Sequence, residues 1–177
     1  MRTATFALFA GIIYLSAGLV GLVPEALWPP PADAPAPTRL MALYGTLLGL
    51  FAVNAAHSGV HILIGIWGVI AWQADHIGRR VRSPRVYARA LALLYGLLAV
   101  LGLIPGTSTL FGFVPLHGHD VWLHAGTALI AAYFGWRGQT DAERRGNDKT
   151  DRREKTQPVP RERRYGHGDR RIPTSEV

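Results

Sequence analysis

Long stretches of this chain carry no charged residue, and their lengths are typical of helices that cross a membrane. Residues 4–23 form an uncharged run of 20 residues, and residues 40–72 form another of 33. A helix that crosses the hydrocarbon core needs about 20 apolar residues, so the first run fits one crossing. The second run would extend roughly 50 Å as one helix, so we expect a short outer segment, 40–52, before the span.

The pattern as a whole predicts four transmembrane helices. The expected spans cover about residues 4–23, 53–72, 87–104 and 120–136. The third stops before Pro105-Gly106, which is a turn signal. The predicted fold is therefore an all-α membrane protein, a four-transmembrane-helix bundle within residues 1–136.

The remaining residues, 137–177, have a different composition. Residues 1–136 carry 11 charged side chains, whereas 137–177 carry 12 basic and 8 acidic ones with almost no bulky apolar residues. Such a segment cannot bury enough apolar surface to fold, so we expect a disordered tail. Its arginine pairs are candidates for contact with anionic lipid, at about 1 kcal/mol for each basic residue, and nucleic acid is not an expected partner. These candidates are Arg144, Arg145, Arg152, Arg153, Arg163 and Arg164.

Arginines in the predicted loops determine the expected orientation. Five arginines lie between the second span and the first turn of the third, at positions 79, 80, 82, 85 and 89, and the tail is also rich in arginine. The other two loops hold only one arginine, Arg39. Because positively charged loops stay inside, we expect a multi-pass protein whose N-terminus and C-terminus are both cytoplasmic.

The two halves of the predicted bundle resemble each other. Residues 11–24 align with 92–105, and residues 46–61 align with 109–124. Prolines, tyrosines and polar residues are matched, which hydrophobic composition alone does not explain. We therefore expect two parallel two-helix repeats, related by an axis along the membrane normal. Matched pairs are Tyr14 with Tyr95, Pro24 with Pro105, Asn54 with His117, His57 with Asp120, and His61 with His124.

Small residues at helical spacing have a simpler interpretation. Gly45 and Gly49 form a GxxxG pattern, and Ala17 with Gly21 forms a similar pair. Such spacing lets helices approach closely in lipid, so helix packing is the expected role.

A cluster of polar side chains is expected within the membrane region. His57 and His61 are four residues apart, as are Asp120 and His124, so each pair shares one face of its helix. Ionisable groups inside a membrane are costly and normally face the bundle interior. Both pairs are expected in the outer-leaflet half of the membrane, because the second and fourth spans enter from outside. The predicted polar cluster consists of Asn54, His57, His61, His117, Asp120 and His124.

Several roles for this cluster are open. The leading interpretation needs no cofactor, because the polar side chains can hydrogen-bond across helices and join the two halves. Alternatively, His57, His61, Asp120 and His124 can ligate zinc or another divalent metal, and His61 with His124 can ligate a haem. A proton or small-solute transporter subunit is a further alternative, although four spans leave little room for a pathway without a homo-oligomer.

Nothing in the sequence supports catalysis. The chain has no cysteine, which excludes disulfides, thiolate metal sites and a cysteine nucleophile. It also lacks the HExxH, P-loop and GxSxG motifs. We therefore expect a non-enzymatic integral membrane protein.

Several blocks of the sequence resemble a known family. Residues 51–54, His57 with His61, residues 95–105 and residues 119–126 resemble a bacterial four-helix membrane family catalogued as domain of unknown function 4383. The resemblance covers nearly all of residues 1–136. In that family an asparagine commonly follows the first histidine, where this chain has Ser58. The resemblance implies a bacterial plasma membrane location and brings no established activity.

Overall fold

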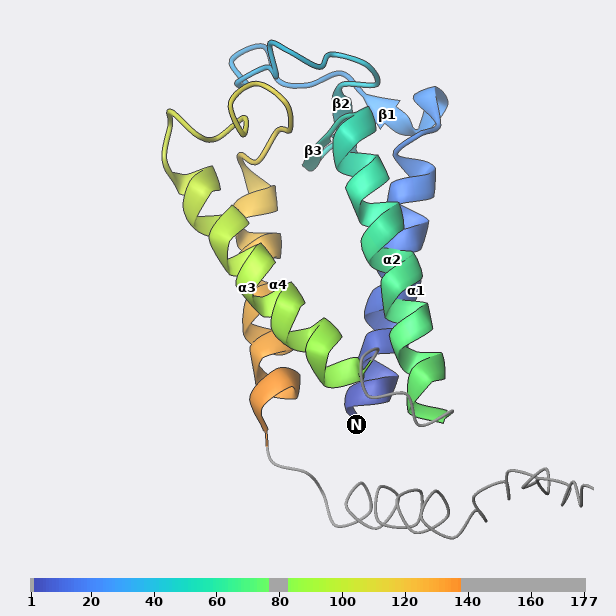
Figure 1. Ribbon diagram of the computed structural model, residues 1–177. Coiled ribbons are helices and arrows are strands. Elements are labelled where there is room, and N and C mark those ends of the chain that lie inside the picture. Colours follow the sequence, from blue (N-terminus) through green and yellow to red (C-terminus); the bar gives the residue numbers. More distant parts are fainter. Residues whose placement is uncertain (1, 77–82, 138–177) are drawn as a thin grey trace, which may run out of the picture. The chain divides into compact units, whose positions relative to one another are not determined.

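The four predicted helices are confirmed by a computed structural model that describes residues 2–76 and 83–137. They belong to one compact unit, Met1–Gln139. The expected disordered tail beyond residue 137 lies outside the described residues, as do its six candidate arginines, at 144, 145, 152, 153, 163 and 164, and the loop arginines at 79, 80 and 82. The helices are α1 (Thr3–Val20), α2 (Ala55–His76), α3 (Pro84–Leu103) and α4 (His119–Trp136) (Figure 1).

The helix ends differ from the predicted ones by a few residues, and local chemistry explains the difference at the start of α3. α3 begins at Pro84 rather than at residue 87, because Ser83 caps the helix and its hydroxyl accepts a hydrogen bond from the Arg85 backbone N–H at 3.2 Å. Proline at the first helical position is favoured, since its missing N–H would be unpaired there in any case. α1 ends at Val20, and a short 3-10 helix, Pro24–Ala26, follows.

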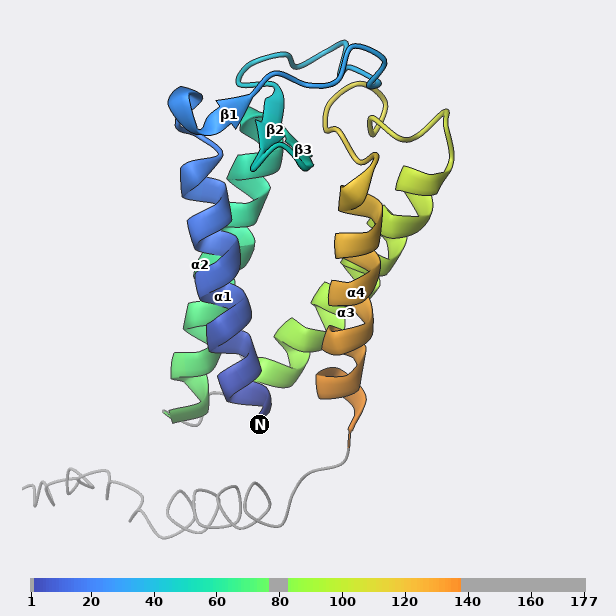
Figure 2. The same ribbon diagram turned by 180° about the vertical axis from the view of Figure 1, so that it is seen from behind.

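The helices are arranged as two pairs (Figures 1 and 2). α1 packs mainly on α2, which we call the first pair, and α3 packs mainly on α4, the second pair. Glycine permits the close approach within the first pair, because a Cβ atom on Gly65 would lie 2.5 Å from the backbone nitrogen of Leu15. Close packing of this kind is the main source of helix association in lipid.

The two pairs meet along a shared core. The rings of Phe6 in α1 and Phe134 in α4 stack with their centroids 4.8 Å apart. The Thr3 hydroxyl also donates a hydrogen bond to the Phe134 carbonyl at 3.3 Å. Tyr87 and Leu91 of α3 are almost completely buried in the same core.

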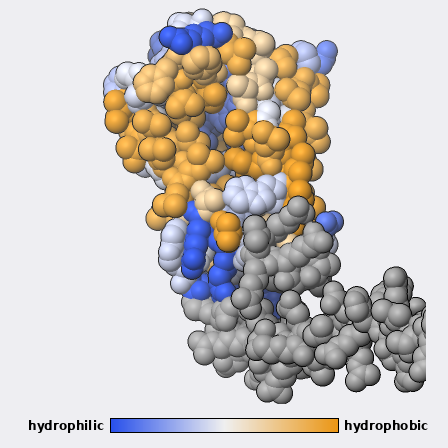
Figure 3. All heavy atoms as spheres, in the orientation of Figure 1, coloured by the Kyte–Doolittle hydropathy of each residue, from blue (hydrophilic) through white to orange (hydrophobic). Residues whose placement is uncertain are grey.

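Large apolar side chains cover the outer surfaces of all four helices. Ile13, Leu63, Leu93 and Leu129, one from each helix, are between 63% and 73% exposed. Figure 3 shows hydrophobic residues over most of one face, with hydrophilic residues at its two ends. Soluble monomers rarely expose a continuous apolar surface of this extent.

Within the described residues, three helices are long and apolar enough to cross a membrane. These are Thr3–Val20, Ala55–Ala74 and Pro84–Leu103. α4 is less apolar because His119, Asp120 and His124 lie in its first two turns. The helices are therefore compatible with insertion into a membrane, as the sequence predicted.

A small antiparallel sheet, which was not predicted from the sequence, lies between α1 and α2. We call residues 21–54, which connect α1 to α2, and residues 104–118, which connect α3 to α4, the outer segments of the two pairs. Its strands are β1 (Leu27–Trp28), β2 (Gly45–Leu47) and β3 (Phe51–Val53), in the order β1-β2-β3. The prediction that Gly45 and Gly49 pack helices is therefore wrong. Gly45 belongs to β2, and Gly49 lies in the turn before β3 with a φ of +69°, a conformation that glycine adopts without strain.

Candidate functional site

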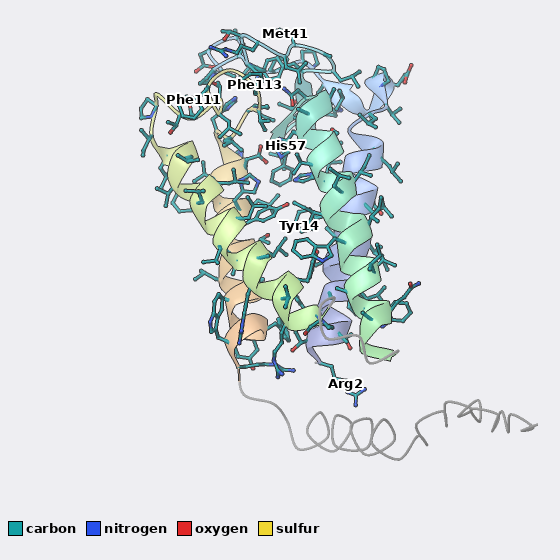
Figure 4. All side chains as sticks on the ribbon, in the orientation of Figure 1. Arg2, Tyr14, Met41, His57, Phe111 and Phe113 are labelled. Carbon is teal, nitrogen blue, oxygen red and sulfur yellow. The ribbon has the colours of Figure 1, made fainter. Side chains whose placement is uncertain are left out.

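Three histidines come together between the two helix pairs. His57 and His61 lie in the first two turns of α2, and His124 lies in the second turn of α4. One ligand atom from each histidine lies within 4.8 Å of the other two. Ring centroids are 4.5 Å apart for His57 and His61, and 6.0 Å apart for His57 and His124. Figure 4 shows His57 directed from α2 toward the second pair.

Two tyrosines pack against these histidines. Tyr14 of α1 lies 5.2 Å from His61, and Tyr95 of α3 lies 4.9 Å from His124, both between ring centroids. The two tyrosine rings are themselves 5.1 Å apart. Tyr14 and Tyr95 are matched positions of the sequence repeat, but their place at the site was not predicted from the sequence. A polar aromatic residue at the same position of both halves was the available signal.

Tyr14 also connects the two helix pairs through its hydroxyl group. This hydroxyl donates a hydrogen bond to the Thr127 side-chain oxygen on α4 at 2.9 Å. Figure 4 shows Tyr14 between the two helix pairs, in the same buried layer as His61, against which its ring packs. Each of the four helices thus contributes a polar or aromatic side chain to this layer.

Asn54 immediately precedes α2 and connects the outer segments of the two pairs. Its side chain is completely buried. The side-chain oxygen accepts a hydrogen bond from the His57 backbone N–H at 2.9 Å, which caps the helix. The side-chain nitrogen donates to the Leu40 carbonyl at 2.9 Å and to the Phe113 carbonyl at 2.7 Å.

The outer segments make further contacts with each other. The Arg39 backbone N–H donates a hydrogen bond to the Gly112 carbonyl at 2.8 Å. The Arg39 guanidinium lies 5.2 Å from the centre of the Phe113 ring, and Phe51 forms a β-bridge with Gly118. Figure 4 places Phe113 and Met41 at the same end of the molecule as His57.

Asp120 and His117, the other two members of the predicted cluster, do not belong to the group that the three histidines form. Asp120 is only 2% exposed, and its Oδ2 atom has no hydrogen-bond partner among the described residues. It is not part of the group of ligand atoms that the histidines form within the described part of the chain. His117 precedes α4 and is half-buried, and this burial lowers its pKa.

The arrangement can be compared with known proteins. Residues 4–137 match the family described as Domain of unknown function (DUF4383). The chain belongs to this family. No curated protein and no solved structure matches the chain. The DUF4383 match covers all four helices, so the histidines, the tyrosines and Asn54 all lie within the family domain.

Chemically, this DUF4383 protein has two kinds of buried polar groups. Side chains such as Tyr14 and Asn54 are paired and connect the halves. By contrast, Nδ1 of His124 is buried and has no hydrogen-bond partner among the described residues. Buried polar atoms are paired in the great majority of cases, so the unpaired ones call for a separate explanation.

Proposed function

We propose that this chain is a non-enzymatic integral membrane protein in which buried polar side chains hold two membrane-spanning helix pairs together. The observation that carries this proposal is the hydrogen bond from Asn54 in the first pair to the Phe113 carbonyl in the second, at 2.7 Å. The Tyr14–Thr127 bond supports it. In lipid, packing and interhelical hydrogen bonds drive association, because the hydrophobic effect between helices is absent.

The proposal includes α4 as the fourth span. α4 has 18 residues, as α1 has, and would extend about 27 Å. Its large apolar residues Leu129 and Ile130 are 73% and 55% exposed, whereas Asp120 and His124 are buried. A helix whose polar residues face the bundle interior can span a membrane despite a lower mean hydropathy.

The repeat is also part of the proposal, and the burial pattern supports it. Seven of the eight buried residues of α1 have a buried counterpart in α3 exactly one repeat later, at the offset of 81 that relates Tyr14 to Tyr95. Matching burial means that the two helices present equivalent faces to the core. The pairs are Thr3 and Pro84, Phe6 and Tyr87, Ala7 and Ala88, Ala10 and Leu91, Gly11 and Ala92, Tyr14 and Tyr95, and Gly18 and Ala99.

Backbone geometry in the outer segments gives the repeat independent support. Leu48 and Gly49 have φ angles of 56° and 69°, and Phe111 and Gly112 have 58° and 88°. Leucine and phenylalanine rarely adopt positive φ. The two turns are separated by the same 63 positions that separate His61 from His124. Coincidence of an unusual conformation at matched positions favours a common two-helix unit.

We further propose that the protein lies in a bacterial plasma membrane with both termini in the cytoplasm. Arg2, Arg85 and Arg89 belong to the end of the helices where α1 begins and α3 begins (Figure 1). Positive charge on this end favours the cytoplasmic side. On this orientation the tail would contact anionic lipid of the inner leaflet through its arginines, and the histidines would lie near the outer leaflet.

Topology is tested with a phosphatase reporter that is active only outside the cytoplasm. A fusion after Val177 should be inactive, and an insertion within residues 29–37 should be active. The reverse pattern would overturn the orientation. A tail fusion and a loop insertion that are both active would overturn the count of four spans.

Joining of the halves is tested by expressing residues 1–79 and 80–177 as two separate chains. The two chains should copurify in mild detergent, and combining Tyr14→Phe with Asn54→Ala should reduce their recovery at least several-fold. Leu63→Ala, on the exposed face of α2, serves as the control and should leave recovery unchanged. Equal recovery with the double variant would contradict the proposed role of the polar side chains.

A further inference from the structure

The proposed joining of the two pairs rests on Tyr14 and Asn54 and assigns no role to the three histidines. Their arrangement indicates a separate role. We propose that His57, His61 and His124 bind a divalent transition-metal ion, with zinc as the expected occupant. Their ligand atoms lie within 4.8 Å of one another, and the three side chains are only 4%, 8% and 1% exposed. Two ligands come from α2 and one from α4, so the ion would bind between the helix pairs.

The geometry is close to what a tetrahedral zinc ion needs. Zinc–nitrogen bonds of about 2.0–2.1 Å at a tetrahedral angle place two ligand nitrogens about 3.4 Å apart. The largest separation of 4.8 Å therefore has to shrink by about 1.4 Å. Rotation of the imidazole side chains about their own torsions is the expected route for a change of this size.

The donor set selects the class of metal. Imidazole nitrogen suits zinc, copper, nickel and iron, whereas calcium and magnesium require oxygen ligands. The chain contains no cysteine, so no thiolate can compete for the ion. Three neutral ligands leave the fourth position for water or a small anion. This set differs from the four-ligand set predicted from the sequence, because Asp120 lies outside the group of ligand atoms.

Ring packing around the site favours a single ion over haem. The His57 ring lies against both His61 and His124, at centroid distances of 4.5 and 6.0 Å. Tyr14 and Tyr95, which pack against His61 and His124, also contact each other, with their ring centroids 5.1 Å apart. A porphyrin between His61 and His124 would have to displace these rings, whereas an ion fits among the nitrogen atoms.

Two of the buried groups without a hydrogen-bond partner support the binding of a cation. Nδ1 of His124 and Oδ2 of Asp120 have no hydrogen-bond partner among the described residues, and the two side chains are 1% and 2% exposed. They lie one turn apart on α4. An ion coordinated by Nδ1 of His124 would be the partner of the imidazole, and its positive charge would offset the buried carboxylate. Asp120 is thus a group that tunes the site from outside the ligand set.

The test uses the full chain, purified in mild detergent, stripped with EDTA and equilibrated with zinc alone. We expect one zinc ion per chain. Since loss of an outer-shell partner already weakens metal binding about 10–100-fold, His57→Gln, His61→Gln and His124→Gln should each weaken it more than about 100-fold. His119→Gln is the matched control, because His119 is an exposed histidine at the start of the same helix as His124.

The outcomes separate clearly. Absence of stoichiometric zinc in the wild-type chain, or equal loss of zinc in His119→Gln, would overturn the proposal. X-ray absorption at the zinc edge of the wild-type protein keeps the test decisive where a variant fails to fold. Three imidazole ligands are expected in that spectrum, and a spectrum with fewer than three would also overturn it.

Discussion

Asn54 offers the sharpest test of how the outer segments stabilise the bundle. Asn54→Ala removes the cap of α2 and the two hydrogen bonds donated to Leu40 and Phe113. Loss of an N-cap costs about 1 kcal/mol. A buried carbonyl that loses its donor costs about 1–3 kcal/mol, and both of these hydrogen bonds are partly buried. Because relaxation and water recover part of the sum, we expect the free energy of unfolding to fall by about 3 kcal/mol.

The assay is a titration of the protein from mild detergent into SDS, followed by far-UV circular dichroism. Asn54→Asp keeps the oxygen that accepts from the His57 N–H but loses both donors, so it isolates the contribution of the outer segments. This variant should still lose about 2 kcal/mol or more. Met41→Ala is the control, because Met41 is 54% exposed in the same outer segment and should change stability by less than about 0.5 kcal/mol.

The reasoning would be refuted by a loss of less than about 1 kcal/mol in Asn54→Ala. It would also fail if Asn54→Asp were as stable as the wild type. The second result would mean that the bonds to the two carbonyls contribute nothing beyond the helix cap.

Three further predictions concern packing, a hydrogen bond and protonation. Gly65→Ala forces a Cβ atom into the backbone of α1 and should lower stability by about 1–3 kcal/mol in the same SDS titration, whereas Gly59→Ala meets nothing within 4 Å and should be neutral or stabilising. Tyr14→Phe loses the bond to Thr127 and should cost about 0.6–1.7 kcal/mol, with an unchanged stability arguing against that bond. Burial lowers the pKa of His117 from its ordinary 6.5, so its contribution is complete above that pH and is lost as the pH falls through the lowered pKa; His117→Gln should flatten the pH dependence of unfolding.

The helices could be predicted because lipid imposes a simple rule on sequence. Uncharged runs located all four, although the fourth run, 121–136, is shorter than a full crossing, and Pro105 and Gly106 marked the end of α3 correctly. The sheet was missed because its strands have only two or three residues each. Leu48-Gly49 is a turn between two short apolar stretches, but the same letters also fit a GxxxG helix pattern, and only the tertiary structure distinguishes them.

At the candidate site, spacing predicted neighbours along one helix better than partners across helices. The four-residue spacing of His57 and His61 placed both on one face of α2, and both are buried there. Asp120 and His124 have the same spacing, yet only His124 joins the other two histidines. Which member of a pair reaches the opposite helix depends on the crossing of α2 and α4, and no local pattern encodes that crossing.

The depth of the three histidines has a consequence for access. At 1.5 Å per residue, His57, His61 and His124 lie roughly 3–9 Å below the first residue of their helices, at one extremity of helices about 27–33 Å long. On the proposed four-span topology, any solute that reaches them would arrive from a single compartment. It must also pass the contacts of Arg39 and Asn54 that close the loops over that extremity. We therefore expect the rate of exchange at this site to depend on how often the loops separate.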